Sequence, residues 1–256
     1  AFLALAIGVL TIAVLRAVPS QPSGDRMLDE IAANGLRQLV RAFATAHLDY
    51  QAYYHTLARD EARGRVAAEL GWPDHNQPVR QFTAAIRRER PLDVVIVLEE
   101  SLGSEFVGRL GSNKASTPHL DRWSAEGLLL TNLVATGNRT VRGLEGVLCS
   151  FPPLPGDSIW KREKSENVAS IARILRGAGY HTEFLYGGAG TFDGMKTFAL
   201  ANGWDHFVED GLIGSDFPKD AFRTAWGVAD QYVFDTMLDH QRQAKKEGKP
   251  FFGTLM

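Results

Sequence analysis

The sequence predicts an α/β fold in which a mostly parallel sheet carries helices on both faces. Two observations from about residue 91 onward support this prediction. Short apolar runs typical of strands alternate with segments of helical spacing, and capping residues and glycines mark where those helices begin and end. Such alternation is the pattern of repeated strand–helix–strand units, which place parallel strands side by side beneath their helices. The chain before residue 91 differs, because an uncharged stretch is followed there by amphipathic helical spacing.

The first fifteen residues, "AFLALAIGVLTIAVL", carry no charge. At 1.5 Å per residue this stretch spans about 22 Å, less than the roughly 30 Å of a bilayer core. We interpret residues 1–18 as a truncated transmembrane helix. The alternatives are the core of a signal peptide, whose positive leading region and cleavage site are not evident, and a buried helix, which the missing polar face disfavours.

Residues 19–90 are expected to form juxtamembrane linker helices. Apolar residues from Leu28 to Phe43 recur at intervals of three and four, which indicates an amphipathic helix. The tyrosines at 50, 53 and 54 suit either a membrane interface or packing against the following domain. The loop-like composition of residues 71–78 places the domain boundary between about residues 75 and 91.

Residues 91–256 supply the strands and helices of the predicted sheet. The run "LDVVIVL" at 92–98 is continuous and β-branched, so we expect a strand buried on both faces. Thr117 as N-cap, Pro118 at the first position and Gly127 as stop define one helix. The further expected strands are 128–134, 180–186 and 250–256, and the further expected helices are 140–150, 166–179, 191–203 and 226–248.

Bulk composition excludes some functions. The net charge of −2 provides no basic field for nucleic acid, so we expect no nucleic-acid partner. The single cysteine, Cys149, cannot form an intrachain disulfide or a CxxC zinc motif, and it leaves the compartment open.

Two glutamates end the first strand. In open α/β sheets, sites form at the carboxyl ends of strands, and a carboxylate there can hold a hard divalent cation. Because adjacent strand residues point to opposite faces, only one of Glu99 and Glu100 is expected to face a given site. A salt-bridged or solvated pair is the alternative.

Thr140 lies between Arg139 and Arg142, after an expected strand and at the start of an expected helix. A helix N-terminus favours an anion, and the two arginines would add charge-assisted contacts to phosphate or sulfate oxygens. A threonine hydroxyl becomes a useful nucleophile only when a base or a metal activates it. The alternative is that Thr140 simply caps the helix.

A glycine-rich turn, "YGGAGTFDGM" at 186–195, follows another expected strand. It matches neither the phosphate-loop nor the dinucleotide-binding pattern, so we do not interpret it as a nucleotide site. Its glycines permit a tight turn and a close approach of the backbone to a ligand.

In their order along residues 92–256, these segments resemble the lipoteichoic acid synthase-type phosphoglycerol transferases. That family comprises membrane-anchored, sulfatase-like enzymes of the alkaline phosphatase superfamily. The matching stretches are "VIVLEESLGSEFVG", "STPHLDRWSAEGLLLTN", "TGNRTVRGLEGVLCSFPPLPG", "FLYGGAGTFDGM", "NGWDHFVED" and "WGVADQYVFD". The resemblance implies an alkaline phosphatase-like catalytic domain over 91–256, C-terminally incomplete, with the segment before it joining membrane helices to that domain.

The resemblance also implies roles for individual residues. Glu100 and Thr140 would be ligands of Mn²⁺ or Mg²⁺, and Thr140 would be the nucleophile. Its oxygen would attack the phosphate of phosphatidylglycerol, release diacylglycerol, and pass a glycerophosphoryl group to an acceptor hydroxyl. Arg139, Arg142 and Asp193 are the expected substrate-binding residues.

Partners and location follow from the same resemblance. The donor would be a phosphatidylglycerol-type lipid and the acceptor a glycan or glycolipid. The protein would lie in the bacterial cytoplasmic membrane, with its catalytic domain on the periplasmic or extracellular side. The family's remaining ligands, an Asp–His pair, and its substrate-contacting His are expected after Met256. Ala189 stands where Gram-positive members have an aspartate, which leaves the donor headgroup and the acceptor open.

Three other functions compete. A sulfatase would use a C/S-x-P-x-R motif, but "SFPPL" at 150–154 has Leu154 in place of the arginine. A phosphoethanolamine transferase of this kind usually carries several disulfides, which one cysteine does not allow. A non-catalytic, membrane-bound relative is the third possibility, and the presence of Thr140, Glu100 and the arginines favours catalysis over it.

Overall fold

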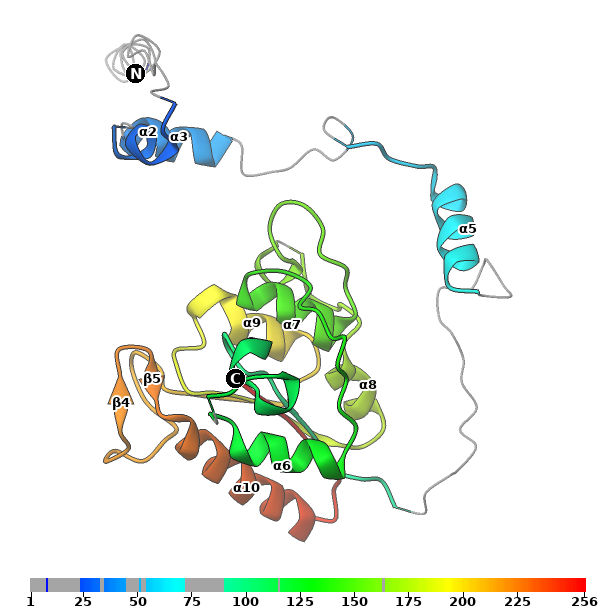
Figure 1. Cartoon of the computed structure of the whole chain (residues 1–256), viewed down its shortest axis with the longest axis vertical. Helices are drawn as coiled ribbons and strands as arrows, with labels where there is room; N and C mark the ends of the chain where they lie inside the picture. The colour runs from blue at the N-terminus through cyan, green and yellow to red at the C-terminus, as the bar shows by residue number, and fades with distance from the viewer. Residues whose placement is uncertain are drawn as a thin grey trace. The chain divides into compact units, whose positions relative to one another are not determined.

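The chain forms two compact units, Ala1–Ala84 and Ala85–Met256, which we describe separately. The computed structural model describes residues 8, 24–32, 35–44, 51, 54–71, 90–114, 116–162 and 164–256. In the first unit these contain α2 (Arg26–Ala32), α3 (Gly35–Ala44) and α5 (Arg59–Glu69) (Figure 1). No helix within the described residues is both long and apolar enough to span a bilayer. Apart from Gly8, the predicted membrane helix at 1–18 lies outside the described residues.

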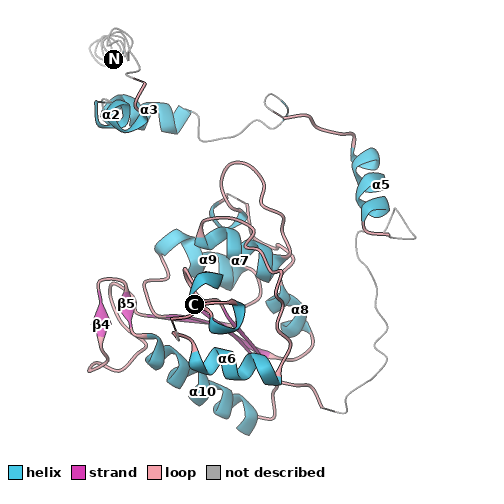
Figure 2. Cartoon of the chain, in the orientation of Figure 1, coloured by secondary structure: helices cyan, strands magenta, loops and turns pink. Residues whose placement is uncertain are grey.

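The second unit is built on a four-stranded sheet in the order β1-β6-β2-β3, with every neighbouring pair parallel. The strands are β1 (Val94–Val97), β6 (Phe251–Leu255), β2 (His181–Tyr186) and β3 (His206–Glu209). The predicted parallel sheet is therefore confirmed. Because all four strands run the same way, their carboxyl ends meet at one edge, where Figures 1 and 2 show the C-terminus.

One face of the sheet is covered by α7 (Thr140–Cys149), α8 (Ile171–Gly177) and α9 (Met195–Ala201). The side chains of alternate strand residues, including Phe184, Phe207 and Phe252, point into this layer. Phe184 stacks on Phe207 at a ring-centroid distance of 5.0 Å. Each such buried side chain contributes about 1.5–3 kcal/mol by leaving water, so this layer anchors the three helices firmly.

The opposite face packs against α10 (Asp230–Lys246) and a hairpin of β4 (Arg223–Thr224) and β5 (Gly227–Val228). The intervening strand residues Leu185, Val208, Phe251 and Leu255 point this way. This alternation of faces is the period-two pattern of a pleated strand. The smaller elements are η1 (Ser104–Phe106), η2 (Gly108–Leu110), α6 (Pro118–Glu126), η3 (Ile159–Lys161) and η4 (Phe192–Gly194).

Several predicted elements need correction. Residues 128–134 form no strand, because no described strand pairs with them and Leu128 is 87% exposed. The first strand is not buried on both faces, since Val95 and Val97 are each 41% exposed while Val94 and Ile96 pack in the core. The last helix begins at Asp230 because residues 227–228 pair in the hairpin instead.

Two other helices are shorter than predicted, and β3 and both strands of the hairpin were not predicted at all. The helix expected at 166–179 is confined to α8, where the Ser170 hydroxyl accepts a bond from the Arg173 N–H. The helix expected at 191–203 is split into η4 and α9 at Asp193, whose φ is 51°. β3 begins at His206, and its four residues are too few to show a clear period in the sequence.

Candidate active site

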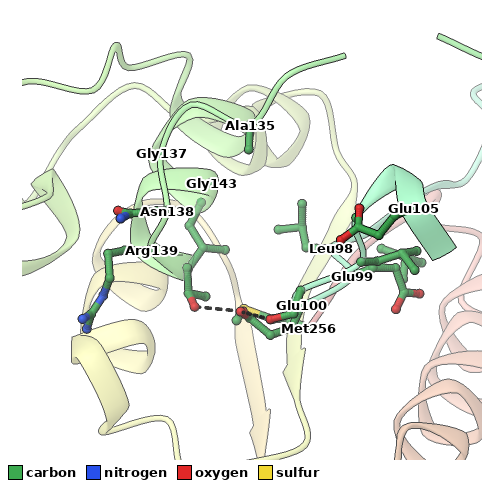
Figure 3. A pocket seen from close by; sticks show the side chains of 16 residues that line it. Leu98, Glu99, Glu100, Glu105, Ala135, Gly137, Asn138, Arg139, Gly143 and Met256 are labelled. Carbon is green, nitrogen blue, oxygen red and sulfur yellow. Dashed lines mark hydrogen bonds between the residues drawn. The ribbon is translucent and has the colours of Figure 1, made fainter. Parts of the chain in front are cut away.

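A cavity of about 520 Å³ opens at the carboxyl edge of the sheet. Its walls come from the segment after β1, from the loop that leads into α7, and from Met256 after β6 (Figure 3). Such a position is where open α/β sheets bind ligands. The residues around it are Val97–Gly103, Glu105, Ala135, Gly137–Thr140, Gly143, Leu144 and Met256.

Glu100 and Thr140 meet inside this cavity. The Thr140 hydroxyl donates a hydrogen bond of 2.8 Å to Oε2 of Glu100, although forty residues separate them in the chain. Thr140 is the first residue of α7, and Arg139 occupies the N-cap without a side-chain capping bond. The hydroxyl is therefore directed at a carboxylate rather than at its own helix, unlike the capping alternative considered from the sequence.

The Glu100 carboxylate also accepts a hydrogen bond from a second hydroxyl. The Ser101 hydroxyl donates to Oε1 of Glu100 at 3.2 Å, and Ser101 has a left-handed φ of 58°. Non-glycine residues in this region cluster at functional sites, where the surrounding structure holds them. Glu99 lines the same cavity but makes no hydrogen bond to Thr140 within the described part of the chain. Of the two predicted carboxylates, only Glu100 meets the threonine.

The two arginines beside Thr140 have different surroundings. Arg139 lines the cavity and is exposed, and Figure 3 shows its guanidinium directed away from Glu100. Arg142 instead forms an ion pair with Glu145, with 2.6 Å between Nη1 and Oε1, and its Nη2 donates to the Gly156 carbonyl. Arg142 does not line the cavity, because these bonds hold its guanidinium elsewhere.

Asp193 is also not in this cavity. Its Oδ1 accepts a bond of 2.7 Å from Nζ of Lys161, and both side chains line a separate cavity of about 620 Å³. The structure therefore brings together Glu100, Thr140 and Arg139 from the predicted set. It places Arg142 and Asp193 in ion pairs outside the pocket.

The first part of the glycine-rich turn after β2, Gly187–Gly190, packs closely against other parts of the protein. The Gly187 carbonyl accepts a bond of 2.8 Å from the Val228 N–H, and a Cβ on Gly227 would lie 1.9 Å from that carbonyl oxygen. The turn is fixed further by Glu209, whose Oε2 accepts the Gly190 N–H at 2.6 Å. Here the glycines serve close packing against the β4–β5 hairpin.

Sequence reasoning missed Tyr186, Asn138 and Met256. Tyr186 ends β2 at the carboxyl edge, and burial, together with the negative charges of Glu100 and Asp193, raises the pKa of its phenol. Asn138 and Met256 line the cavity itself. The position of Tyr186 at the end of a predicted strand is the one signal that could have identified it.

Comparison with known proteins places this chain in a family. The sequence model of the sulfatase family matches residues 93–256. The chain belongs to the sulfatase family. This match covers the whole sheet and both segments that supply Glu100 and Thr140, so the resemblance to sulfatase-like enzymes of the alkaline phosphatase superfamily is confirmed.

The relatives include phosphoglycerol transferases. Phosphoglycerol transferase I of Xanthomonas euvesicatoria pv. vesicatoria (strain 85-10) is 24% identical over 152 residues, which are 54% of this chain and 21% of that protein. The protein of the same name from Xanthomonas campestris pv. campestris matches to the same extent. The chain thus spans about a fifth of the length of these relatives.

Two solved structures share the fold. One is a protein in the alkaline phosphatase superfamily from Vibrio parahaemolyticus, with 39% identity and a TM-score of 0.62 over 66% of this chain and 41% of that chain. The other is the lipoteichoic acid synthase LtaP from Listeria monocytogenes, with 18% identity and a TM-score of 0.56 over 64% and 40%. The predicted alkaline phosphatase-like architecture is confirmed.

Proposed function

We propose that this protein is a metal-dependent transferase that moves a glycerophosphoryl group from a phosphatidylglycerol-type lipid to an acceptor hydroxyl. Thr140 is the covalent nucleophile in this proposal. The observation that carries it is the hydrogen bond of 2.8 Å from the Thr140 hydroxyl to Glu100, in a cavity at the carboxyl edge of a sulfatase-family sheet. The phosphoglycerol transferases among the relatives support the choice of substrate.

In the first step the Thr140 oxygen forms a bond to phosphorus as the bond from phosphorus to the diacylglycerol oxygen breaks. The hydroxyl proton passes to water in this step, because Glu100, whose Oε2 accepts that hydrogen bond here, would be held by the cation proposed below. The departing oxygen takes up a proton and leaves as diacylglycerol. In the second step an acceptor hydroxyl attacks the same phosphorus, loses its proton, and returns the Thr140 oxygen to its hydroxyl form.

Members of this superfamily typically use divalent metals. Within the described residues no group of three or more His, Cys, Asp or Glu is arranged to hold one. Glu100 and Thr140 nevertheless offer two converging oxygens, the donor chemistry that Mn²⁺ or Mg²⁺ prefers, and we propose them as ligands. A bound cation would supply positive charge that lowers the pKa of the hydroxyl and offsets charge on the phosphate.

The phosphate oxygens would lie near the start of α7. This helix has ten residues, and its first N–H groups and dipole favour an anion at Thr140. Arg139, exposed at the cavity wall, can turn toward such an anion and add a charge-assisted hydrogen bond. Asn138 lines the same wall and adds a neutral amide.

The cellular setting follows from the proposed donor lipid. The protein would act at the bacterial cytoplasmic membrane, with the catalytic unit on the periplasmic or extracellular side and a glycan or glycolipid as acceptor. Sulfate-ester hydrolysis through Ser150 is disfavoured, because Ser150 is the C-cap of α7 and Thr140 begins that helix. Ten helical residues span about 15 Å, which separates Ser150 from the pocket.

The test uses the protein expressed from its native gene, in membranes, with labelled phosphatidylglycerol and Mn²⁺. Diacylglycerol release and a glycerophosphoryl adduct on the peptide containing Thr140 are measured. We expect Thr140→Ala to abolish the adduct and to lower release by about 10³-fold or more, because the covalent route is lost. Thr140→Ser should keep part of the activity, because it keeps a hydroxyl.

Glu100→Gln keeps the shape of the side chain but removes its charge, and we expect it to lower release by about 10²-fold or more. Release that is unchanged in Thr140→Ala would contradict the proposal. An adduct on Thr140 from phosphatidylethanolamine but not from phosphatidylglycerol would assign the other headgroup.

A further inference from the structure

Glu145 is a fully buried carboxylate in α7, five residues after Thr140. Its Oε1 pairs with Arg142 at 2.6 Å, and its Oε2 accepts the Ile159 N–H at 2.8 Å. The Ser158 hydroxyl lies 2.6 Å from the same Oε2. A buried carboxylate is tolerated only when its charge is paired and its oxygens are hydrogen-bonded, and both conditions are met here.

These bonds join α7 to the segment 156–159. Arg142 supplies a second link, since its Nη2 donates to the Gly156 carbonyl, and Ser158 supplies a third, 3.1 Å from the Val141 carbonyl. We call the group Arg142, Glu145 and Ser158 the α7 clamp. Only 16% of the Arg142 side chain is exposed, so this ion pair is shielded from solvent far more than a surface pair.

The α7 clamp contacts α7 on a different side of the helix from Thr140. At about 100° per residue, Glu145 lies about 140° around the helix axis from Thr140. Apolar packing by Leu144 and Leu148 holds the helix on the sheet but tolerates small rotations and slides. Directional, charge-assisted bonds do not, because their strength falls quickly with angle and distance.

We propose that Arg142 and Glu145 are positioning residues for Thr140. By fixing the rotation and the axial position of α7, they hold the Thr140 hydroxyl on Glu100. This inference rests on the proposed function for its kinetic readouts. It replaces the expectation that Arg142 binds substrate with a structural role for the same arginine.

The kinetic test compares Glu145→Gln, Arg142→Gln and the double variant in the protein expressed from its native gene. Glu145→Gln keeps the side-chain shape and can still accept from Ile159, but it removes the ion pair. We expect kcat for diacylglycerol release to fall by about 10–100-fold while KM for the lipid stays within about twofold, because a misplaced nucleophile slows the chemical step.

The double variant decides between positioning and substrate binding. If the two residues act as one unit, the double variant should be no slower than the slower single variant. If Arg142 instead contacts the lipid phosphate, Arg142→Gln should raise KM and its effect should multiply with that of Glu145→Gln. That second pattern would overturn the proposal. Arg176→Gln is the matched control, because it breaks the more exposed pair between Arg176 of α8 and Asp205 before β3, and it should leave both constants unchanged.

Hydrogen exchange gives a readout independent of activity. Peptides covering 140–146 should exchange faster in Glu145→Gln than in the wild type, whereas Arg176→Gln should match the wild type there. Unchanged exchange in Glu145→Gln would overturn the proposed role of the α7 clamp, whether or not the wild-type protein releases diacylglycerol. Absence of diacylglycerol release by the wild type would refute only the proposed function. If Glu145→Gln fails to fold, Ser158→Ala removes the contacts of Ser158 with Glu145 and the Val141 carbonyl but keeps the ion pair, and it should show the same pattern with a smaller amplitude.

Discussion

Each of the two edges of the sheet carries a glutamate that accepts two hydrogen bonds, but the surroundings of the two glutamates differ. At the carboxyl edge, Glu100 is exposed and, within the described residues, accepts hydrogen bonds from the hydroxyls of Thr140 and Ser101. Toward the amino ends of β2 and β3, on the face that packs against α10 (here called the amino edge), the Glu183 side chain is 5% exposed. Both of its oxygens lie against imidazole rings, that of His181 at 2.5 Å and that of His240 at 2.7 Å.

The cavities at the two edges are similar in size. The cavity at the amino edge measures about 480 Å³, close to the 520 Å³ of the carboxyl edge. What differs is how the charged groups are satisfied. A carboxylate paired twice and buried stabilises the fold, whereas an exposed carboxylate facing a hydroxyl remains available to a ligand. The partners of a cluster, rather than the volume beside it, indicate which edge is functional.

The largest expected effect on stability is at the amino edge. Glu183→Ala removes the shared acceptor of His181 and His240, and we expect it to lower the free energy of unfolding by about 2 kcal/mol. Glu100→Ala removes an exposed carboxylate and should change the same quantity by less than about 0.5 kcal/mol. Urea unfolding followed by fluorescence of the buried Trp160 and Trp204 measures both. Equal losses of unfolding free energy in the two variants would contradict the proposed difference between the two edges.

The stability at the amino edge depends on pH through the shifted pKa values of Glu183 and His240. Burial opposes the ionisation of Glu183, but the hydrogen bonds from His240 and His181 outweigh it and lower the pKa of Glu183 below its ordinary 4.5. The hydrogen bond to Glu183, with the charges of Glu183, Asp239 and Asp216, outweighs burial and raises the pKa of His240 above its ordinary 6.5.

The directions of these two pKa shifts determine the pH range in which the Glu183 cluster stabilises the fold. A lowered carboxyl pKa contributes stability above pH 4.5 that is lost as the pH falls through the folded-state value. A raised imidazole pKa contributes stability below pH 6.5 that is lost as the pH rises through the folded-state value. The difference in unfolding free energy between wild type and Glu183→Gln should therefore be largest between pH 4.5 and 6.5 and should shrink on both sides. A difference that keeps growing toward pH 8 would contradict the paired arrangement.

The sequence predicted the carboxyl edge better than the amino edge. Glu99 and Glu100 could be found because they follow a recognisable strand, and the carboxyl ends of parallel strands meet at one edge. The family resemblance then selected Glu100. Thr140 could be found because it begins a recognisable helix, although the strand predicted before it does not form. His181, Glu183 and His240 could not be found in that way. Their meeting depends on which face of β2 receives α10, and no spacing within either element specifies that contact.

Arg142 and the segment 128–134 show two other limits of the sequence. Three residues separate Arg142 from Glu145, which allows an ion pair along one helix face, but only the fold shows that the pair is buried against residues 156–159. The apolar segment 128–134 has the composition of a strand, yet a strand forms only where a neighbour pairs with its backbone. Both features depend on long-range packing, which local pattern does not contain.

The smallest expected effect sharpens the assignment of Glu100 over its neighbour. Glu99→Gln is matched to Glu100→Gln in chemistry and lies one residue earlier, but Glu99 makes no hydrogen bond to Thr140 within the described residues. We expect Glu99→Gln to change the rate of diacylglycerol release by less than about threefold, against about 10²-fold or more for Glu100→Gln. Both variants are measured at one saturating Mn²⁺ concentration and one subsaturating concentration. A lower rate of diacylglycerol release in Glu99→Gln that higher Mn²⁺ restores would mean that both carboxylates contribute to the cation site. The assignment of that site to Glu100 and not Glu99 would then be wrong.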